Sequence, residues 1–394
     1  MTRYLLRGRV LTPARSLDPG TVLVEDGRVA WVRAGEHRVA GAELLTDPGD
    51  AVAPGFIDLQ VNGFAARDTA EGLDAIEHVA AALPATGVTA FMPTLISRPV
   101  AEGRRFVESA ARVQGAGARV LGAHLEGPFL SPRHPGAHDP QELIAPTPER
   151  VAALMARPPR MTTLAPELPG ALEAIARLSR AGVLVSLGHS AATAEEAAAG
   201  FAAGARFVTH LFNAMSAFKH RQPGLPGAAL ADPRPTVGLI ADGEHVHPLA
   251  MELAIRLKGP RGVALTTDQT AAAGAPPGNH LLGGEEVVSD GRTVRREDGT
   301  LAGSIATMDG MVRVLAGLGT GLREAVEMAT LTPARALGER GLGRIRAGAP
   351  ADLVVLDADL RVKLTLIGGR ICHRPSGVPR VKVSGGGSGV LAKP

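Results

Sequence analysis

The chain is poor in the residues that mark disulfide-rich secreted proteins and thiolate metal sites. It has one cysteine, Cys372, among 394 residues, and aromatic residues make up only 3%. A single cysteine excludes an intrachain disulfide and a metal site built from several thiolates. The first residues, MTRYLLRGRVLTP, lack the apolar core and cleavage site of a signal peptide. No apolar run approaches the ~18 residues of a membrane-spanning helix. We therefore expect a soluble, cytoplasmic protein with no membrane partner.

The composition and net charge of the chain argue against some classes of partner. Hydrophobic residues are 45% and charged residues 21% of the chain, which is typical of a globular protein. The net charge is +3, spread along the chain, and no basic run carries interleaved aromatic residues. This pattern predicts no nucleic-acid partner and weakly favours an anionic small molecule as substrate.

The middle of the chain alternates between apolar runs with polar ends and Ala/Leu-rich stretches of helical periodicity. Eight such alternations predict an α/β protein of the (β/α)8, TIM-like barrel class. A doubly wound open sheet shares the alternation, but no G-x-G-x-x-G follows the first run, so the barrel is favoured. The expected strands are 55–61, 88–95, 119–126, 161–167, 182–189, 206–210, 236–242 and 262–268.

Both ends of the chain are β-rich. TVLVEDGRVAWV has two strand-like runs around Asp26-Gly27, a hairpin signal, and residues 351–372 have the same character. We predict that residues 1–50 and 346–382 form one small β-sandwich domain beside a barrel of residues 51–345. Residues 383–394 are Gly/Ser-rich and are expected to be a flexible tail.

Polar and titratable residues recur at the carboxyl ends of the expected strands. The loops at these ends form one shared mouth in a barrel, so the side chains should lie together. A glutamate at the end of a buried strand, such as Glu126, is costly unless a cation meets it. The residues are Gln60, Asn62, His124, Glu126, His189, His210, His245 and Asp268.

Three of these residues have the chemistry of a metal site. Glu126, His189 and His210 offer one carboxylate and two imidazoles, which suit a divalent cation such as Zn²⁺ with a fourth position open for water. Asp268 has the chemistry and the position of a general base. Each has a plainer interpretation: Glu126 alone could form a salt bridge, and Asp268 could cap the following segment. A lone histidine at a strand end is more often structural than a ligand, so we expect a structural or supporting role for His124.

Seven motifs resemble those of the N-acetylglucosamine-6-phosphate deacetylases, of the amidohydrolase superfamily. The resemblance implies that Glu126, His189 and His210 are the metal ligands and that Asp268 is the catalytic acid/base. It covers nearly the whole barrel, and its motifs are PGFIDLQVNG, HLEGPFL, LGHS, THLFNAM, IADGEHVHP, TTDQTAAAG and LAGSIATMDG.

The same resemblance implies how a substrate would be held. His138 falls on the histidine that helps to hold the acetamide carbonyl, with Ala137 beside it as a main-chain contact. Arg221 and His245 fall on groups that engage the sugar phosphate. Members of the family are commonly homodimers, sometimes with a phosphate contact from the partner. The remaining implied substrate contacts are Asn213, Ala214 and a closing loop at Ala306, Thr307 and Met308.

One position departs from the wider superfamily. Many amidohydrolases carry His-x-His at the end of the first strand and hold two metals, whereas this chain has Gln60-Val61-Asn62. Neutral amides are poorer zinc ligands than imidazole, so Gln60 and Asn62 would mark a vestigial second-metal position. We expect one divalent metal per subunit, zinc before others.

The implied reaction converts N-acetylglucosamine 6-phosphate to glucosamine 6-phosphate and acetate, in amino-sugar catabolism or recycling. The alternative is a deacetylase of another phosphorylated amino sugar, such as N-acetylgalactosamine 6-phosphate. More distant alternatives are an N-acyl amino acid deacylase, a cyclic amidase, and a barrel retained as a non-catalytic scaffold. The scaffold has least support, because all three ligands and the base are present.

Overall fold

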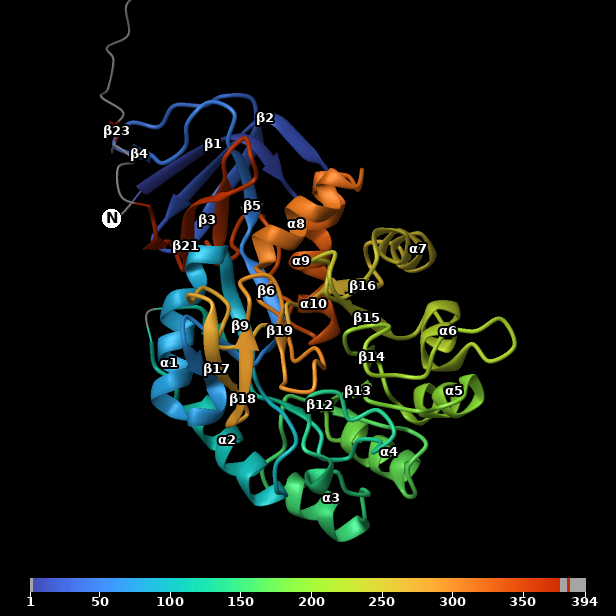
Figure 1. Ribbon diagram of the computed structural model, residues 1–394. Coiled ribbons are helices and arrows are strands. Elements are labelled where there is room, and N and C mark those ends of the chain that lie inside the picture. The colour runs from blue at the N-terminus through green and yellow to red at the C-terminus, as the bar shows by residue number, and fades with distance from the viewer. Residues whose placement is uncertain (1–2, 116, 376–380, 383–394) are drawn as a thin grey trace, which may run out of the picture.

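Eight parallel strands form the centre of the molecule, and all eight lie where the sequence predicts them (Figure 1). The structure is a computed structural model that describes residues 3–115, 117–375 and 381–382. The strands pair in chain order, and an isolated parallel bridge joins Val61, at the end of the first strand, to Gln269, which follows the last strand. The predicted barrel is therefore confirmed. Its strands are β6 (Phe56–Val61), β9 (Val88–Leu95), β11 (His124–Glu126), β12 (Met161–Leu164), β13 (Leu184–Leu187), β14 (Phe207–Val208), β15 (Thr236–Leu239) and β16 (Val263–Leu265); the short β10 (Arg119–Val120) also pairs with β9.

Amphipathic helices cover the outside of this sheet. In α4 (Ala171–Arg180), Ala171, Ala174, Ile175 and Leu178 are buried, and their three- and four-residue spacing places them on one face. None of the helices in the described ranges is long and apolar enough to cross a membrane. The other helices are α1 (Leu73–Ala82), α2 (Val100–Arg112), α3 (Pro148–Met155), α5 (Ala194–Ala203), α6 (Gly224–Ala231), α7 (Pro248–Lys258), α8 (Met308–Gly317), α9 (Leu322–Ala329) and α10 (Leu331–Ala336), with short 3₁₀ turns η1 (Thr69–Glu71), η2 (Leu83–Thr86) and η3 (Pro140–Glu142).

The two ends of the chain share a second sheet, as predicted. Its central ladder pairs β5 with β20 in antiparallel register, so the N-terminal and C-terminal strands meet in its middle. Asp26 and Gly27 have φ of 47° and 82° between β2 and β3, which is the backbone that an Asp-Gly hairpin turn requires. The strands are β1 (Arg3–Leu11), β2 (Ser16–Glu25), β3 (Arg28–Ala34), β4 (Glu43–Leu44), β5 (Ala51–Pro54), β20 (Leu353–Leu356), β21 (Val362–Ile367), β22 (Arg370–His373) and β23 (Val381–Lys382).

The terminal sheet encloses its own apolar core. Val22, Val52, Val355 and Leu366, from both halves of the sheet, belong to one buried cluster. The sheet includes Ala51–Pro54, directly after the predicted limit at residue 50. The domain limits themselves stay predictions, and the expected tail at 383–394 lies outside the described residues.

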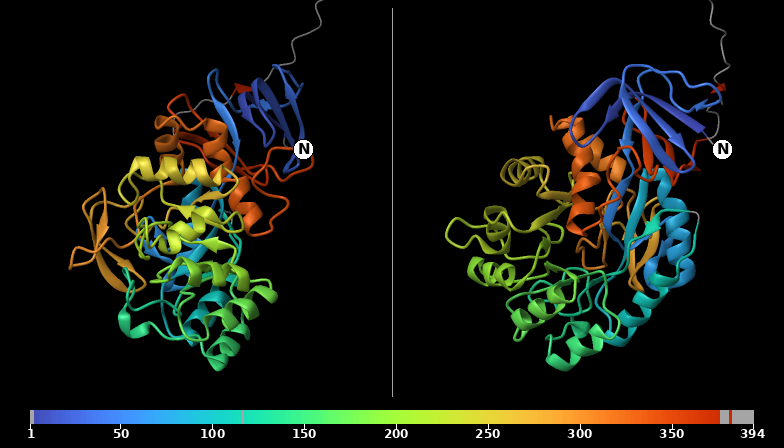
Figure 2. Two further views of the ribbon diagram at one scale, coloured as in Figure 1. Left: turned by 90° about the vertical axis from the view of Figure 1, so that its right-hand side faces the viewer. Right: turned by 180° about the vertical axis from the view of Figure 1, so that it is seen from behind.

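A small antiparallel unit, not predicted from the sequence, lies between β16 and α8. It consists of β17 (Gly278–Leu282), β18 (Glu285–Ser289) and β19 (Val294–Arg295), and it projects beyond the barrel strands (Figure 2, left). Its buried Leu282 and Val287 pack against Ile96, which follows β9. The unit therefore lies over the carboxyl ends of the strands, beside the mouth. A further short pair, β7 (Gly63–Phe64) and β8 (Arg67–Asp68), follows β6.

Candidate active site

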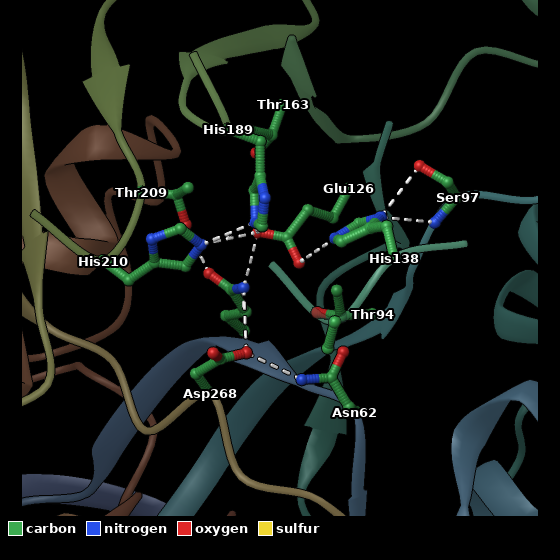
Figure 3. A network of polar contacts seen from close by, with 12 residues as sticks. Asn62, Thr94, Ser97, Glu126, His138, Thr163, His189, Thr209, His210 and Asp268 are labelled. Carbon is green, nitrogen blue, oxygen red and sulfur yellow. Dashed lines mark hydrogen bonds and ion pairs between the residues drawn. The ribbon is translucent and has the colours of Figure 1, made fainter. Parts of the chain in front are cut away.

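The ends of β11, β13 and β14 bring Glu126, His189 and His210 together (Figure 3). Glu126 Oε1 lies 3.0 Å from His210 Nε2 and 3.5 Å from His189 Nε2. The two imidazole nitrogens are themselves 3.1 Å apart. All three residues are buried. One carboxylate oxygen and two ring nitrogens thus converge on a single point, which is the donor set of a divalent metal.

His138 is a fourth member of this group. Its Nε2 lies 3.5 Å from Glu126 Oε2, on the other side of the carboxylate. Glu126, His138 and His189 offer ligand atoms that all lie within 4.8 Å of one another, so they too could hold a metal ion. Distance alone therefore allows two ligand sets that differ in whether His138 or His210 completes them.

The hydrogen bonds of the second ring nitrogens separate these histidines. His189 Nδ1 lies 3.1 Å from the carbonyl oxygen of His134, which only accepts, so Nδ1 carries a proton and a neutral ring keeps its lone pair on Nε2. His138 has the opposite arrangement, because its Nδ1 accepts a hydrogen bond. The Ser97 main-chain N–H donates to its Nδ1 at 3.0 Å, so a neutral His138 carries its proton on Nε2. His189 is thereby prepared to bind a cation, and His138 to donate a hydrogen bond.

His210 has the less satisfied ring. Its Nδ1 is buried and has no hydrogen-bond partner among the described residues, while its Nε2 is the nitrogen nearest to Glu126. A buried polar atom left without a partner is unusual in a protein interior. The polar contacts of this ring are on the Nε2 side, where the donor set converges.

Asp268, after β16, lies beside the donor set and not within it. Its Oδ1 accepts hydrogen bonds from Gln60 Nε2 at 2.9 Å and from Asn62 Nδ2 at 2.7 Å. Burial, together with the nearby charge of Glu126, raises the pKa of Asp268 to about 6. A carboxyl with this pKa takes up and releases protons near neutral pH, as a general acid/base must.

Burial favours the neutral form of both His138 and Glu126, but only His138 ends up neutral. Burial lowers the pKa of His138 to about 4, so its ring is neutral at pH 7. Burial alone would raise the pKa of Glu126, but the charge and hydrogen bonds of the surrounding imidazoles hold that pKa well below its usual range. The site therefore contains one fixed anion, a neutral donor and a carboxyl that can change its protonation state.

Three of the site residues have left-handed backbones, which are rare outside glycine. The φ angles are 46° at His189, 24° at His210 and 51° at Asp268. Each costs about 1–3 kcal/mol, and main-chain hydrogen bonds hold the turns in place, such as Asp268 N to Gln60 O at 3.0 Å. The strand ends thus turn sharply, which directs their side chains toward one another (Figure 3).

A cavity of about 260 Å³ opens above these residues. It is lined by most of the predicted site residues, namely Asn62, Glu126, Ala137, His138, His189, His210, Asn213, Ala214, His245 and Asp268. The structure adds lining residues that the sequence did not suggest: Ile96, Gly136, Ile240, Leu282, Thr300, Leu301 and Gly303.

His245 gives this cavity a basic wall. Its Nδ1 lies 2.7 Å from Asp242 Oδ2, and its main-chain N–H donates to Asp242 Oδ1 at 2.9 Å. Burial alone would raise the pKa of Asp242, but the hydrogen bond and charge of His245 lower it. The contact with Asp242 uses Nδ1, so Nε2 is the ring nitrogen that remains for a ligand in the cavity.

The other predicted substrate contacts lie elsewhere in this chain. Arg221 is exposed and lines a second cavity of about 380 Å³, with Arg133 and Lys219. Thr307 caps α8, and Met308 is buried in the apolar core. These positions and Ala306 are not among those that line the cavity, whose wall here is formed by Thr300, Leu301 and Gly303. Their roles as substrate contacts stay predictions.

Two buried residues that matter to the geometry were not singled out from the sequence. Ser97 holds Nδ1 of His138, and Thr209 donates to the side chain of Gln60. Both are polar residues at or near strand ends, so the rule that found the histidines could have included them. His124, by contrast, is buried and hydrogen-bonded to Thr163 Oγ1 at 2.8 Å, as a structural histidine would be.

Comparison with known proteins places this site in a family. Residues 51–372 match the amidohydrolase family. An N-acetylgalactosamine-6-phosphate deacetylase of Escherichia coli O157:H7 is 39% identical, over 94% of this chain and 99% of that protein. The human N-acetylglucosamine-6-phosphate deacetylase is 40% identical, over 91% of this chain and 89% of that protein.

A solved structure of a related deacetylase has the same fold as this chain. A mutant of the N-acetyl-D-glucosamine-6-phosphate deacetylase of Mycobacterium smegmatis, in complex with N-acetyl-D-glucosamine-6-phosphate, superposes with a TM-score of 0.89 and 36% identity. The similarity covers 94% of this chain and 100% of that one. With its parallel barrel, its terminal sheet and the buried carboxylate–imidazole cluster at the strand ends, the chain belongs to the amidohydrolase family.

Proposed function

We propose that this protein hydrolyses the acetamide of N-acetylglucosamine 6-phosphate and releases glucosamine 6-phosphate and acetate. The observation that carries the proposal is the convergence of Glu126, His189 and His210 beside Asp268, whose raised pKa suits proton transfer. Relatives and solved structures that act on phosphorylated amino sugars support the substrate class.

Glu126, His189 and His210 are the residues that would hold one divalent metal, with zinc the ion that best suits one carboxylate and two imidazoles. His189 belongs to both possible sets, so the choice between them depends on the third residue. A neutral His138 presents a proton at Nε2, which favours the set that contains His210. When bound, the metal supplies Lewis acidity toward the amide carbonyl and lowers the pKa of water.

Two residues do the remaining chemistry. Asp268, as the carboxylate, removes the proton from the attacking water while the new C–O bond forms. It then delivers that proton to the sugar nitrogen as the C–N bond breaks, so that the amine leaves neutral. His138 donates a hydrogen bond from Nε2 to the carbonyl oxygen as negative charge develops there, and Ser97 fixes the ring that makes this donation.

We propose that His245 receives the phosphate of the substrate. Its Nδ1 contact with Asp242 leaves Nε2 free to donate to a phosphate oxygen, and His245 lines the cavity that holds the metal cluster. Asn213 and Ala214, in the loop after β14, line the same cavity, which suits contacts with the sugar.

A second candidate substrate is N-acetylgalactosamine 6-phosphate. The bacterial relative named for that sugar is as similar to this chain as the relatives named for the gluco epimer. The two sugars differ in the orientation of one hydroxyl group. The chemistry of the cluster is the same for both.

We also propose that the active protein is a homodimer in the cytoplasm. Leu249, Leu253 and Leu257 follow one another at four-residue spacing on α7, and all three are exposed. Arg221 is exposed and lies outside the cavity that contains His245, so a phosphate contact from Arg221 would have to be made to the partner's site.

Sedimentation velocity tests the dimer: the double variant Leu253→Glu, Leu257→Glu should sediment as a monomer, whereas Leu172→Glu, an exposed leucine on α4, should not change the mass.

The proposed function is tested by acetate release with metal content measured in parallel. The substrates are N-acetylglucosamine 6-phosphate, its galactosamine epimer and unphosphorylated N-acetylglucosamine. We expect about one metal per chain and at least tenfold higher kcat/KM on the first substrate than on the unphosphorylated sugar, roughly the value of one charge-assisted contact. Equal rates on both would contradict a phosphate site at His245. A preference for the galacto epimer would select the second candidate.

A further inference from the structure

Glu167, which follows β12, lies beside the turn that comes directly after the proposed metal ligand His189. Its Oε1 accepts a hydrogen bond from the main-chain N–H of Ala191 at 2.6 Å, and its Oε2 accepts one from Ser190 Oγ at 2.7 Å. Ser190 is fully buried, and its hydroxyl oxygen also accepts the main-chain N–H of Ala192 at 3.0 Å. Hydrogen bonds to an ionised acceptor are roughly twice as strong as neutral ones. One carboxylate therefore fixes the first two residues after His189.

The backbone of His189 needs such support. Its φ of 46° lies in the left-handed region, which is unfavourable for a residue other than glycine. The main-chain N–H of Ser131 donates to the carbonyl oxygen of His189 at 2.9 Å, and His189 Nδ1 contacts the carbonyl oxygen of His134. Both of these contacts come from the loop after β11, whereas Glu167 holds the chain from the end of β12. His189 is therefore held from two sides.

Ser190 connects this turn to the loop that carries the second imidazole. The main-chain N–H of Ser190 donates to the carbonyl oxygen of Ala214 at 3.2 Å, and the main-chain N–H of Ser216 donates to the carbonyl oxygen of Ser190 at 2.8 Å. Residues 210–216 form the loop after β14, which begins with His210. The carboxylate of Glu167 thus belongs to a network that joins the loops of both proposed imidazole ligands.

We propose that Glu167 is a positioning residue of the metal site, which sets the direction of His189 and, through the joined loop, that of His210. Zinc binds an imidazole nitrogen at about 2.0–2.1 Å, so a small rotation of either loop would move a ring out of bonding range. Glu167 acts through Ser190 and the main chain and not by contact with the metal. The inference rests on the metal ligands of the proposed function, but not on the substrate or the reaction.

The zinc affinity of the metal-free protein, measured by competition with a chelating dye, tests this role. Glu167→Ala removes both acceptor oxygens, and we expect the affinity to fall about 10–100-fold, the usual effect of losing a residue that supports a metal ligand. Glu167→Gln keeps one oxygen for the N–H of Ala191 and should restore the affinity to within about tenfold of the unaltered protein. In the Co²⁺-bound protein, Glu167→Ala should also change the visible absorption spectrum, which reports the coordination geometry.

Two further variants serve as control and safeguard. Asp357→Ala removes a carboxylate that accepts the main-chain N–H groups of Asp359 at 2.9 Å and Arg361 at 2.8 Å, in the turn between β20 and β21. It should lower the thermal stability of the metal-free protein and leave the zinc affinity and the cobalt spectrum unchanged. Ser190→Ala removes only the hydroxyl contact, so it decides the question if Glu167→Ala does not fold. We expect its zinc affinity to fall about threefold to tenfold, the effect of one hydrogen bond.

The outcomes separate this inference from the proposed function. A zinc affinity that falls in Glu167→Ala and Ser190→Ala but not in Asp357→Ala supports the role of Glu167. An unchanged affinity in the first two variants, or an equal fall in Asp357→Ala, would overturn it. Zinc binding without acetate release from any sugar phosphate contradicts the proposed reaction and leaves the role of Glu167 intact. If the unaltered protein binds no zinc, both proposals fail.

Discussion

Two buried carboxylates, one at the junction of the domains and one at the mouth of the barrel, are held in opposite ways. Asp352, in the junction, receives two N–H groups of Arg119 at 3.0 Å each and the main-chain N–H of Gly368. Glu126, at the mouth, contacts three imidazoles and one amide. No lysine or arginine is paired with Glu126 in the part of the chain that the structure describes.

The difference distinguishes a structural carboxylate from one in a binding site. Asp352 has a fixed cation and needs nothing more. Glu126 is surrounded by rings that are neutral when they present lone pairs, so the protein alone leaves its negative charge without a permanent partner. A buried anion beside converging lone pairs is a cation site, whereas a buried anion beside a guanidinium is part of the framework.

The largest effect is expected for a substitution that removes the acid/base at the mouth of the barrel and leaves the metal ligands unchanged. Asp268→Asn keeps the size of the side chain and removes its ability to carry a proton. We expect kcat to fall about 10²–10⁴-fold and metal content, measured by mass spectrometry, to be unchanged. A variant that retains most of its activity would show that Asp268 is not the acid/base.

The second prediction tests which of the imidazoles around Glu126 binds the metal. His210→Gln removes a ring whose Nε2 faces the cluster, and we expect metal affinity to fall at least about 100-fold. His138→Gln removes a ring that presents a proton, so metal affinity should change little while acetate release falls. Isothermal titration of the metal-free proteins with Zn²⁺ measures both. The reverse pattern would make His138 the ligand and contradict the tautomer that its contact with Ser97 indicates.

A third buried carboxylate extends the comparison to a case without any cation. Asp58, in β6, is held only by hydrogen bonds, among them Thr267 Oγ1 at 2.6 Å, and burial raises its pKa from 3.8 to about 6. The folded state thus binds this proton more tightly than the unfolded state does. The stability that the group contributes is complete below pH 4 and is lost as the pH rises through 6.

Asp58→Asn removes this pH dependence. The free energy of unfolding of the unaltered protein, relative to the variant, should therefore increase by up to ~3 kcal/mol as the pH falls from 7 to 4. Urea denaturation of both proteins at each pH gives the difference and cancels the effects of other carboxylates. Parallel pH profiles would show that Asp58 has an ordinary pKa in the folded state.

The smallest effect is expected when the ion pair between Arg119 and Asp352 is broken. Arg119→Met leaves Asp352 buried without its cation, and we expect a loss of about 1–3 kcal/mol in the free energy of unfolding, reduced because Arg119 is partly exposed. The kcat should be unchanged, since this pair lies at the junction with the terminal sheet. Arg3→Met, which breaks the exposed pair with Glu25, is the matched control and should cost less than about 1 kcal/mol. Equal losses in the two variants would show that Asp352 does not depend on Arg119.

Much of the barrel could be predicted because its strands are mainly apolar and are followed by polar residues. The positions of Glu126, His189, His210 and Asp268 follow from the same rule, since the ends of parallel strands in a barrel meet at one mouth. The small unit β17 to β19 could not be predicted in this way. Its exposed and buried residues alternate over only a few positions, and it is rich in charge and glycine.

The finer geometry of the site depends on contacts that no local pattern records. Thr209 meets Gln60 across 149 positions, and Ser97 meets His138 across 41. The contact with Ser97 sets the tautomer of a ring, which depends on which neighbour donates and which accepts. Residue type and spacing indicate that a histidine is present at a strand end, but the tautomer follows only from its neighbours.

The ladder between β5 and β20 makes the order of synthesis matter. Strands β1, β2 and β3 can pair as soon as they leave the ribosome, because they are neighbours in the chain. The edge that β5 offers to β20 stays open until the entire barrel has been translated. During that interval an unpaired strand edge is exposed to other nascent chains. A chain cut short before Leu353 would therefore lose a strand that this sheet needs, so two segments about 300 residues apart are under one shared constraint.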